Sequence, residues 1–344
     1  MRPAALVAAL LLGSCASLAP RPAVPPVTEP ELRALIAELA SDRFEGRMSG
    51  TSGERRTLDF LEGELRRRGA VGAAPGGGFR MAFAIPPQMK PVPGAQPGLP
   101  SGQQQFLKAV NAAGATTSHN LVARLPGRRP DGRVVLLVAH WDHLGLCRPP
   151  GEADRICNGA VDNASGVAAL LALVGRVRAM RAEREVLILF TGAEEWGLLG
   201  AKAFAAAPPV ALSRIVAGFN LDMIAVAPAG MPVAIVADRG SPLEPLVRAA
   251  ARARKRSWDG DRQAAAFVDR QDGWPLTQRG VPMAMAGGSF SDMKRLEAFL
   301  GGRYHGPDDE LDERTDLGGA VDDANLHLEL IRRAAARSFR PRRR

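Results

Sequence analysis

Continuous apolar runs are the feature that most constrains the fold of this 344-residue chain. Residues 134–139, 186–191 and 215–221 contain almost no polar side chains. A strand with one wet face alternates polar and apolar residues, whereas a strand covered on both faces does not. The runs therefore predict central strands of a sheet that has helices on both faces.

Segments with helical periodicity separate these runs, and the alternation predicts an α/β fold. The expected architecture is a mixed, largely parallel central sheet flanked by helices on both faces. Further strands are expected at 79–85, 233–237 and 281–286. Helices are expected at 31–39, 54–68, 165–181, 195–206, 243–256, 292–300 and 321–337.

The first fifteen residues have the pattern of an export signal. Arg2 precedes an apolar stretch, 4–12, that is too short to span about 30 Å of hydrocarbon. Leu-Gly-Ser-Cys at 12–15 resembles a bacterial lipoprotein box, in which the cysteine is acylated. We expect an exported, periplasmic or cell-surface protein that contacts the membrane only through a lipid anchor at Cys15. A plainly secreted or uncleaved chain with an incidental Cys15 is the alternative.

Two further cysteines, Cys147 and Cys157, lie ten residues apart. In an oxidising compartment such a pair more often forms a disulfide than a metal site. Neither cysteine has a partner at zinc-finger spacing, so a zinc-thiolate site is the weaker alternative.

The formal net charge of +9 arises mainly from the C-terminal residues 332–344, which include seven arginines. The rest of the chain is close to neutral, and only 5% of all residues are aromatic. A surface that binds single-stranded nucleic acid combines clustered basic residues with stacking aromatics. We therefore expect no nucleic-acid partner. The tail is interpreted as a solvated terminus, with contact to anionic lipid or polysaccharide as the alternative.

Polar residues stand where the apolar runs end, at the edge where open α/β sheets bind ligands. Together with residues of two other loops they are His140, Asp142, Asp162, Glu194, Glu195, Asp222 and His305. Imidazole and carboxylate groups without thiolates suit zinc or another divalent first-row metal. The set contains two histidines and more than three carboxylates. Even two histidines and three carboxylates exceed the needs of one four-coordinate zinc that keeps a water. They suit two ions about 3.5–4 Å apart that share one carboxylate.

With these clusters in this order, the chain resembles the M28 family of zinc aminopeptidases. The resemblance begins at residues 43–47 and 50–54 and continues to Tyr304 and His305. The implied reaction is hydrolysis of N-terminal peptide bonds by a water that two zinc ions activate. The implied organisation is a signal peptide with lipobox at 1–15, a proline-rich tether at 16–30, one peptidase domain at 31–337 and a basic tail at 338–344.

The resemblance also implies a role for each polar residue. His140 and Asp222 would bind one zinc ion, Glu195 and His305 the other, and Asp162 would bridge them. Glu194 would be the general base and acid. Asp142 would fix the tautomer of His140. A cis-like peptide is implied after Asp162. We interpret His143 as a loop or pocket residue, and His119 and His327 as structural or exposed.

Glu194 and Glu195 are expected on the first turn of the helix at 195–206, where neighbouring side chains point about 100° apart. One carboxylate could then face a metal ion while the other faces the water.

One position departs from the family pattern. Where many relatives carry Ser-Asp-His, this chain has Gln271-Asp272-Gly273. Substrate choice or catalytic efficiency could therefore differ.

Other functions of the same scaffold remain open. They are glutaminyl-cyclase-like chemistry with one metal, carboxypeptidase-like chemistry, and a non-catalytic binding module. The expected partner is a peptide substrate, and the expected oligomeric state is a monomer.

Overall fold

The structure is a computed structural model that describes residues 24–86, 117–313 and 315–341. The predicted signal peptide and Cys15 lie outside the described residues. The strands are β1 (Val71–Gly72), β2 (Arg80–Ala84), β3 (Thr117–Leu125), β4 (Val134–His140), β5 (Gly145–Leu146), β6 (Ile156–Cys157), β7 (Glu185–Thr191), β8 (Ile215–Asn220), β9 (Ala234–Val236) and β10 (Met283–Gly287).

Helices alternate with these strands along the chain. The longer helices are α1 (Glu29–Leu39), α2 (Ser52–Arg67), α4 (Ser165–Met180), α5 (Leu199–Ala206), α6 (Glu244–Ala253), α8 (Met293–Leu300) and α9 (Gly318–Ala334). The shorter ones are η1 (Asp42–Arg47), η2 (Ala160–Ala164), η3 (Leu212–Arg214), η4 (Gln263–Phe267) and α7 (Gly273–Thr277).

An eight-stranded mixed sheet forms the centre of the fold, as predicted. Its order is β1-β3-β7-β4-β8-β10-β9, and β2 also pairs with β3. The four central strands, β7, β4, β8 and β10, run parallel, whereas the outer strands pair antiparallel. Because the central strands are parallel, their carboxyl ends lie along one edge of the sheet.

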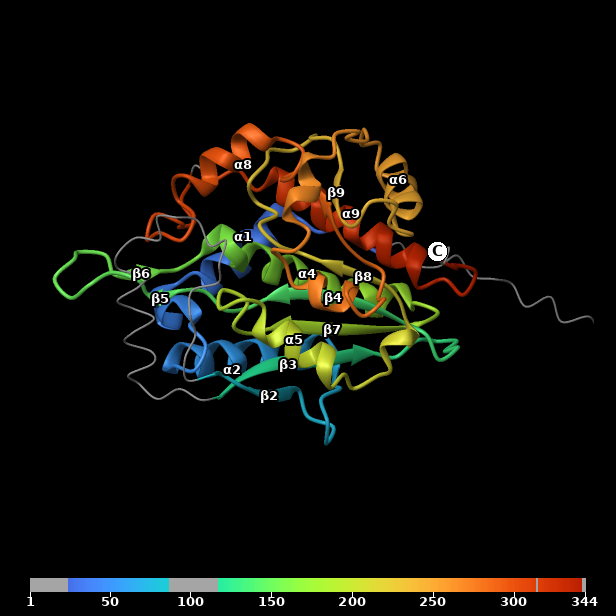
Figure 1. The fold of residues 1–344 in the computed structure, drawn as a ribbon, viewed down its shortest axis with the longest axis horizontal. Coiled ribbons are helices and arrows are strands. Elements are labelled where there is room, and N and C mark those ends of the chain that lie inside the picture. Colours follow the sequence, from blue (N-terminus) through green and yellow to red (C-terminus); the bar gives the residue numbers. More distant parts are fainter. Residues whose placement is uncertain (1–23, 87–116, 314, 342–344) are drawn as a thin grey trace, which may run out of the picture.

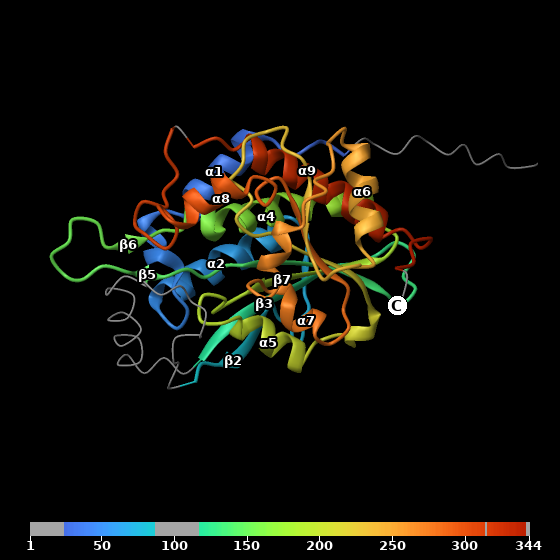
Figure 2. The ribbon, with the colours of Figure 1, turned by 45° about the horizontal axis from the view of Figure 1, so that its top comes forward.

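Both faces of the sheet are covered, as the apolar runs predicted. In β4, Val135 and Leu137 pack into the cluster that includes α1, α4 and α9. Their neighbours Leu136 and Val138 pack into the cluster on the other face, which includes Phe204 of α5. Figures 1 and 2 show α1, α4 and α9 on one side of the strands and α5 on the other.

Two expectations about the elements differ from the structure. Strand β3 was not predicted, because its polar Ser118 and Asn120 interrupt the apolar pattern, yet both are fully buried. The helix expected at 195–206 begins only at Leu199, since Leu198 has a left-handed backbone (φ 62°). Glu194 and Glu195 therefore lie in a turn, and the argument from neighbouring positions on a helix was wrong.

One described segment, Ala160–Met180, has the length and hydropathy of a membrane span. Within the fold, 89% of its most apolar window is buried. Since α4 packs against α9, α1 and β4, the segment is interpreted as the central helix of the protein core.

His327 of α9 is fully buried and structural, one of the two predicted possibilities. Its Nδ1 donates a hydrogen bond to the Asp323 carbonyl oxygen (2.7 Å), and its ring meets Phe219 edge-on. Burial lowers the pKa of His327 from 6.5 to about 4. The folded chain therefore holds this imidazole neutral through mildly acidic pH.

This burial predicts a pH-dependent loss of stability. As pH falls from 6.5 to 4, the unfolded chain takes up a proton at His327 that the folded chain does not. The free energy of unfolding of the wild type should therefore fall, relative to His327→Gln, by about 3 kcal/mol. Urea unfolding of both chains at pH 7 and pH 4 measures the difference. Equal pH slopes for the two chains would contradict the prediction.

Candidate metal centre

The predicted ligand residues gather at the carboxyl edge of the parallel strands. His140 is the last residue of β4, Glu195 follows β7, and Asp222 follows β8. Asp162 lies in η2, just before α4, and His305 lies between α8 and α9. The structure thus brings all five residues together from five separate segments.

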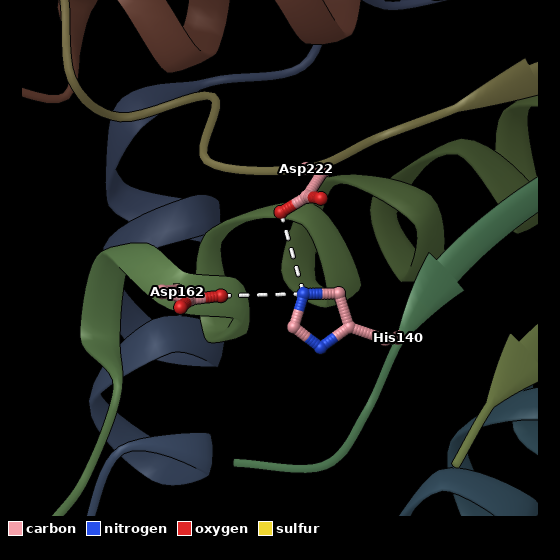
Figure 3. A group of neighbouring side chains, drawn as sticks. All are labelled: His140, Asp162 and Asp222. Carbon is pink, nitrogen blue, oxygen red and sulfur yellow. Dashed lines mark hydrogen bonds and ion pairs between the residues drawn. The ribbon is translucent and has the colours of Figure 1, made fainter. Parts of the chain in front are cut away.

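His140, Asp162 and Asp222 form the first group (Figure 3). His140 Nε2 lies 3.2 Å from Asp162 Oδ1 and 3.3 Å from Asp222 Oδ1. All three side chains are at least nine-tenths buried. The three donor atoms converge on one point, as ligands of a single cation do.

Glu195 and His305 form the second group with the other oxygen of Asp162. His305 Nε2 lies 2.8 Å from Glu195 Oε2 and 3.2 Å from Asp162 Oδ2. Asp162 therefore directs one oxygen to each group. This arrangement matches a carboxylate that bridges two cations, the role that the family resemblance implied.

The backbone around Asp162 is held in an unusual form. The Asp162–Asn163 peptide is cis, as the resemblance implied. The buried carboxylate of Asp309 accepts hydrogen bonds from the backbone N–H groups of Val161 and Asp162, both at 3.0 Å. Asn163 Nδ2 donates to the Leu221 carbonyl oxygen (3.0 Å), next to Asp222. These bonds fix Asp162 relative to the end of β8.

Asp309 is expected to control metal affinity without touching the ion. Asp309→Ala leaves two buried N–H groups without their acceptor and frees the segment that carries Asp162. Loss of such supporting contacts typically lowers metal affinity 10- to 100-fold, so we expect roughly that effect. Competition with a chromophoric chelator measures the zinc affinity.

Asp308→Ala provides the matched control, because Asp308 is exposed and adjacent in sequence. Its zinc affinity should equal that of the wild type. An Asp309→Ala protein that binds zinc as tightly as this control would show that Asp309 does not position Asp162.

Glu194 lies beside the first group. A carboxylate oxygen of Glu194 lies within 4.8 Å of the ligand atoms of His140 and Glu195. Burial, together with the carboxylates of Asp272 and Glu195, raises the pKa of Glu194 well above its usual value. A carboxylate with a raised pKa next to a cation site can accept and return a proton, which suits the predicted base.

Asp142 contacts the site through different atoms from those we expected. His140 Nδ1 lies 3.2 Å from the backbone oxygen of Asp142 and 3.9 Å from its carboxylate. The carboxylate instead accepts a hydrogen bond from the backbone N–H of Glu194 (3.1 Å). The backbone oxygen of Asp142 therefore orients the ring of His140. The carboxylate of Asp142 positions Glu194.

His143 and Tyr304 also lie at the site. The sequence interpretation described His143 only as a loop or pocket residue and gave Tyr304 no role. His143 Nδ1 lies 2.7 Å from Glu195 Oε1, and His143 forms a possible metal group with Asp162 and Glu195. The ring of Tyr304 stacks on His305 with centroids 3.7 Å apart. The position of His143 three residues after His140 is the only signal in the sequence that could have suggested its role.

Arg47 ties together the segments that carry the site. This fully buried arginine donates hydrogen bonds to the carbonyl oxygens of Leu39, Trp141 and Gly159 at 2.8–3.0 Å. Gly46 precedes it with φ 63°, and a Cβ there would lie 2.4 Å from the Cys157 carbonyl oxygen. A larger residue at position 46 would thus displace the loop before Asp162.

The protonation of the site shows where a cation fits. Burial alone would lower the pKa of His140, but Asp222 and Glu194 hold it well above its usual value. Burial also opposes the charge on His305, yet Glu195 and Asp162 raise its pKa to about 10. The Nε2 atom of each histidine lies between two buried carboxylates. A cation bound there would displace the proton from the imidazole.

The donor set fits metal ions. It consists of carboxylate oxygens and imidazole nitrogens, which are ligands for zinc and other divalent first-row metals. Both cysteines of the described residues are bonded to each other in the Cys147–Cys157 disulfide, which confirms the predicted pair. The disulfide closes the β5–β6 hairpin, and Cys157 Sγ lies 3.7 Å from the His305 backbone oxygen.

Solved structures with the same fold are zinc exopeptidases and related enzymes. A zinc aminopeptidase from Bacillus subtilis has a TM-score of 0.63 at 16% identity, covering 89% of this chain and 95% of that one. A Zn-dependent exopeptidase from Parabacteroides distasonis has a TM-score of 0.60 at 20% identity, covering 90% and 99%. A glutaminyl cyclase from Porphyromonas gingivalis has a TM-score of 0.59 at 19% identity, covering 88% and 97%. The fold is therefore of the zinc-exopeptidase class.

The chain belongs to peptidase family M28. The family model matches residues 120–331, which include all the ligand residues named above. Among curated proteins, a vacuolar membrane protease from Vanderwaltozyma polyspora is 33% identical over 87 residues. That match covers 25% of this chain and only 8% of the relative's length.

Proposed function

We propose that this protein is a two-zinc aminopeptidase that removes N-terminal residues from peptides outside the cytoplasm. The observation that carries the proposal is the division of the two Asp162 oxygens between two histidine–carboxylate groups, at 3.2 Å in each case. His140 and Asp222 would hold one zinc ion and Glu195 and His305 the other. When bound, the ions lower the pKa of a water and polarise the substrate carbonyl.

The side chains around the ions have separate tasks in this mechanism. Glu194 accepts the proton of the attacking water and returns it to the leaving amine. The Asp142 carboxylate holds the backbone N–H of Glu194 at 3.1 Å and so orients the base. Asp309 and Asn163 hold the bridging Asp162 in place.

A small cavity beside the site supports an exopeptidase with a preference for apolar first residues. Its volume is about 40 Å³. His140, Asp162, Glu194 and Asp222 line it together with Met223, Phe267, Arg270, Gln271, Met285, Phe290, Leu300 and Tyr304. The apolar walls suit one compact apolar side chain, and the carboxylates suit the free amino group next to it.

Metal content and substrate turnover together test the proposal. We expect two zinc ions per chain and faster hydrolysis of leucyl anilide than of aspartyl anilide. N-acetylated anilides should not be hydrolysed, because they lack the free amino group. One zinc ion per chain with cyclisation of N-terminal glutamine would instead identify a glutaminyl cyclase.

A further inference from the structure

The amino ends of the parallel strands lie on a surface opposite the metal centre. Three segments meet there: 126–133 before β4, 176–185 from the last turn of α4 to the first residue of β7, and 335–341 after α9. We call these residues the arginine end. They contain nine arginines and three carboxylates, and apart from the three terminal arginines the rest of the chain has no net charge.

Hydrogen bonds join the three segments into one surface. The backbone N–H groups of Arg128 and Arg129 donate to the carbonyl oxygens of Ala182 and Glu183 (2.9 and 3.0 Å). Buried Arg184 donates to the carbonyl oxygens of Ala334 and Phe339 (2.9 and 3.0 Å). The arginine end is thus a fixed part of the fold.

Several of its arginines lack an ionic partner. Arg178, Arg181 and Arg340 are exposed, and among the described residues none of their guanidinium groups forms an ion pair with a carboxylate. Arg337 is also exposed, and its backbone N–H donates to the Glu183 carboxylate (2.8 Å). Arg128, by contrast, pairs with Glu183 at 2.6 Å. Unpaired arginines in one patch attract anions, because their mutual repulsion is relieved when an anion binds.

A cavity of about 240 Å³ opens between three arginines of this surface. Arg128, Arg178 and Arg181 line it together with the apolar Leu125 and Val177. Arg178 packs over Gly69, where a Cβ would lie 2.1 Å from its Nη1. The cavity therefore joins cationic and apolar walls, which suits a phosphate group attached to an apolar molecule.

The chain also enters the described fold near this surface. Arg176, which is two residues before Arg178 and five before Arg181, donates to the carbonyl oxygens of Pro25 and Pro26 (2.9 and 2.7 Å). A lipid on Cys15 would be nine residues from Val24, a reach of at most about 30 Å. Such an anchor would keep the arginine end close to the bilayer.

We propose that the arginine end docks on an anionic phospholipid bilayer and that the cavity beside Arg178 and Arg181 takes the phosphate group of one lipid. The seven residues of β4 separate this surface from His140 by roughly 20 Å. The docked enzyme therefore presents its metal centre away from the membrane.

Vesicle binding tests the proposal in the full chain with Cys15→Ser, which cannot carry a lipid. Vesicles of phosphatidylcholine alone are compared with equimolar phosphatidylglycerol and phosphatidylcholine at 50 and 300 mM NaCl. Binding should be stronger to the anionic vesicles and should weaken with salt. Arg178→Gln/Arg181→Gln should lose about thirtyfold in binding to them, because each arginine contributes about 1 kcal/mol near an anionic surface.

Lys294→Gln/Arg295→Gln is the matched control, since it removes two exposed charges from α8. The control should bind like the parent chain, and both variants should retain the melting temperature and peptidase activity. Equal binding of the parent to the two vesicle types would overturn the proposal, as would equal losses in both variants. The variant could instead lose binding to dextran sulfate and keep binding to vesicles. That result would overturn the proposal in favour of an acidic polysaccharide.

Discussion

The Glu194→Gln protein is expected to keep two zinc ions per chain and to turn over peptides roughly 10²- to 10⁴-fold more slowly than the wild type. Glutamine has almost the same shape as glutamate, so the packing of the turn after β7 should be preserved. The amide cannot accept the proton of the attacking water, so the chemical step loses its base. Steady-state hydrolysis of leucyl anilide, with metal analysis of the same sample, measures both quantities.

A second glutamate gives the control for this experiment. Glu297→Gln changes an exposed residue of α8 and should leave kcat and the metal content unchanged. If Glu194→Gln also kept full turnover, another group would have to be the base. If it lost its zinc, Glu194 would be a ligand rather than the base.

Asp162→Ala is expected to lose both zinc ions and to abolish detectable turnover. Its two oxygens lie 3.2 Å from His140 Nε2 and from His305 Nε2, so the substitution removes a donor from each group. It also leaves the surrounding imidazoles and carboxylates without the group that joins them. Zinc content after dialysis and the rate of leucyl anilide hydrolysis test this expectation.

Asp222→Ala distinguishes a ligand of one group from a bridging ligand. Asp222 contacts His140 of the first group and not His305 of the second group. This variant should retain one zinc ion per chain, held by Glu195 and His305. Two ions retained in Asp162→Ala, or equal losses in the two variants, would contradict a bridging Asp162.

The central sheet could be predicted from the sequence because its strands are buried on both faces. Runs such as 134–139 leave no alternative to a covered strand, and helical periodicity between them indicates the crossover connections. β3 escaped prediction because buried Asn120 interrupts the apolar pattern and finds its hydrogen-bond partners only in the folded chain. Asn120 donates from Nδ2 to the Gly200 carbonyl oxygen (2.8 Å) and accepts at Oδ1 from the Gly192 N–H (3.1 Å).

The convergence of His140, Glu195 and Asp222 was also predictable, since they stand at the ends of predicted strands. The places of Asp162 and His305 in the site were expected only from the family resemblance. For His143 the sequence predicted only a loop or pocket residue, because an isolated histidine in a loop carries no pattern. Its 2.7 Å contact with Glu195 depends on the turn after β7. The atoms that Asp142 uses were misjudged for the same reason. The position of a residue at a strand end predicts which other residues lie near it. The backbone conformation of the next two residues determines which of their atoms make contact.

The residues that support the site were outside the reach of sequence reasoning. Arg47 and Asp309 are 262 positions apart, yet both hold the segment that carries Asp162. Arg47 is the last residue of the short helix η1, and Asp309 lies in the loop between α8 and α9. Their role follows only from the hydrogen bonds that they make to main-chain atoms, and the identity of those atoms is not encoded in a local pattern.

The distribution of the ligands along the chain has a consequence for biosynthesis. His140 and His305 are separated by 164 intervening residues, so the two groups cannot both be complete until the chain has been synthesised past His305. Zinc would then bind after the central sheet has formed, and it would join the sheet to the loop that carries His305. Under the proposed function, a chain that lacks zinc would therefore be folded but would hydrolyse no peptide until the metal is supplied.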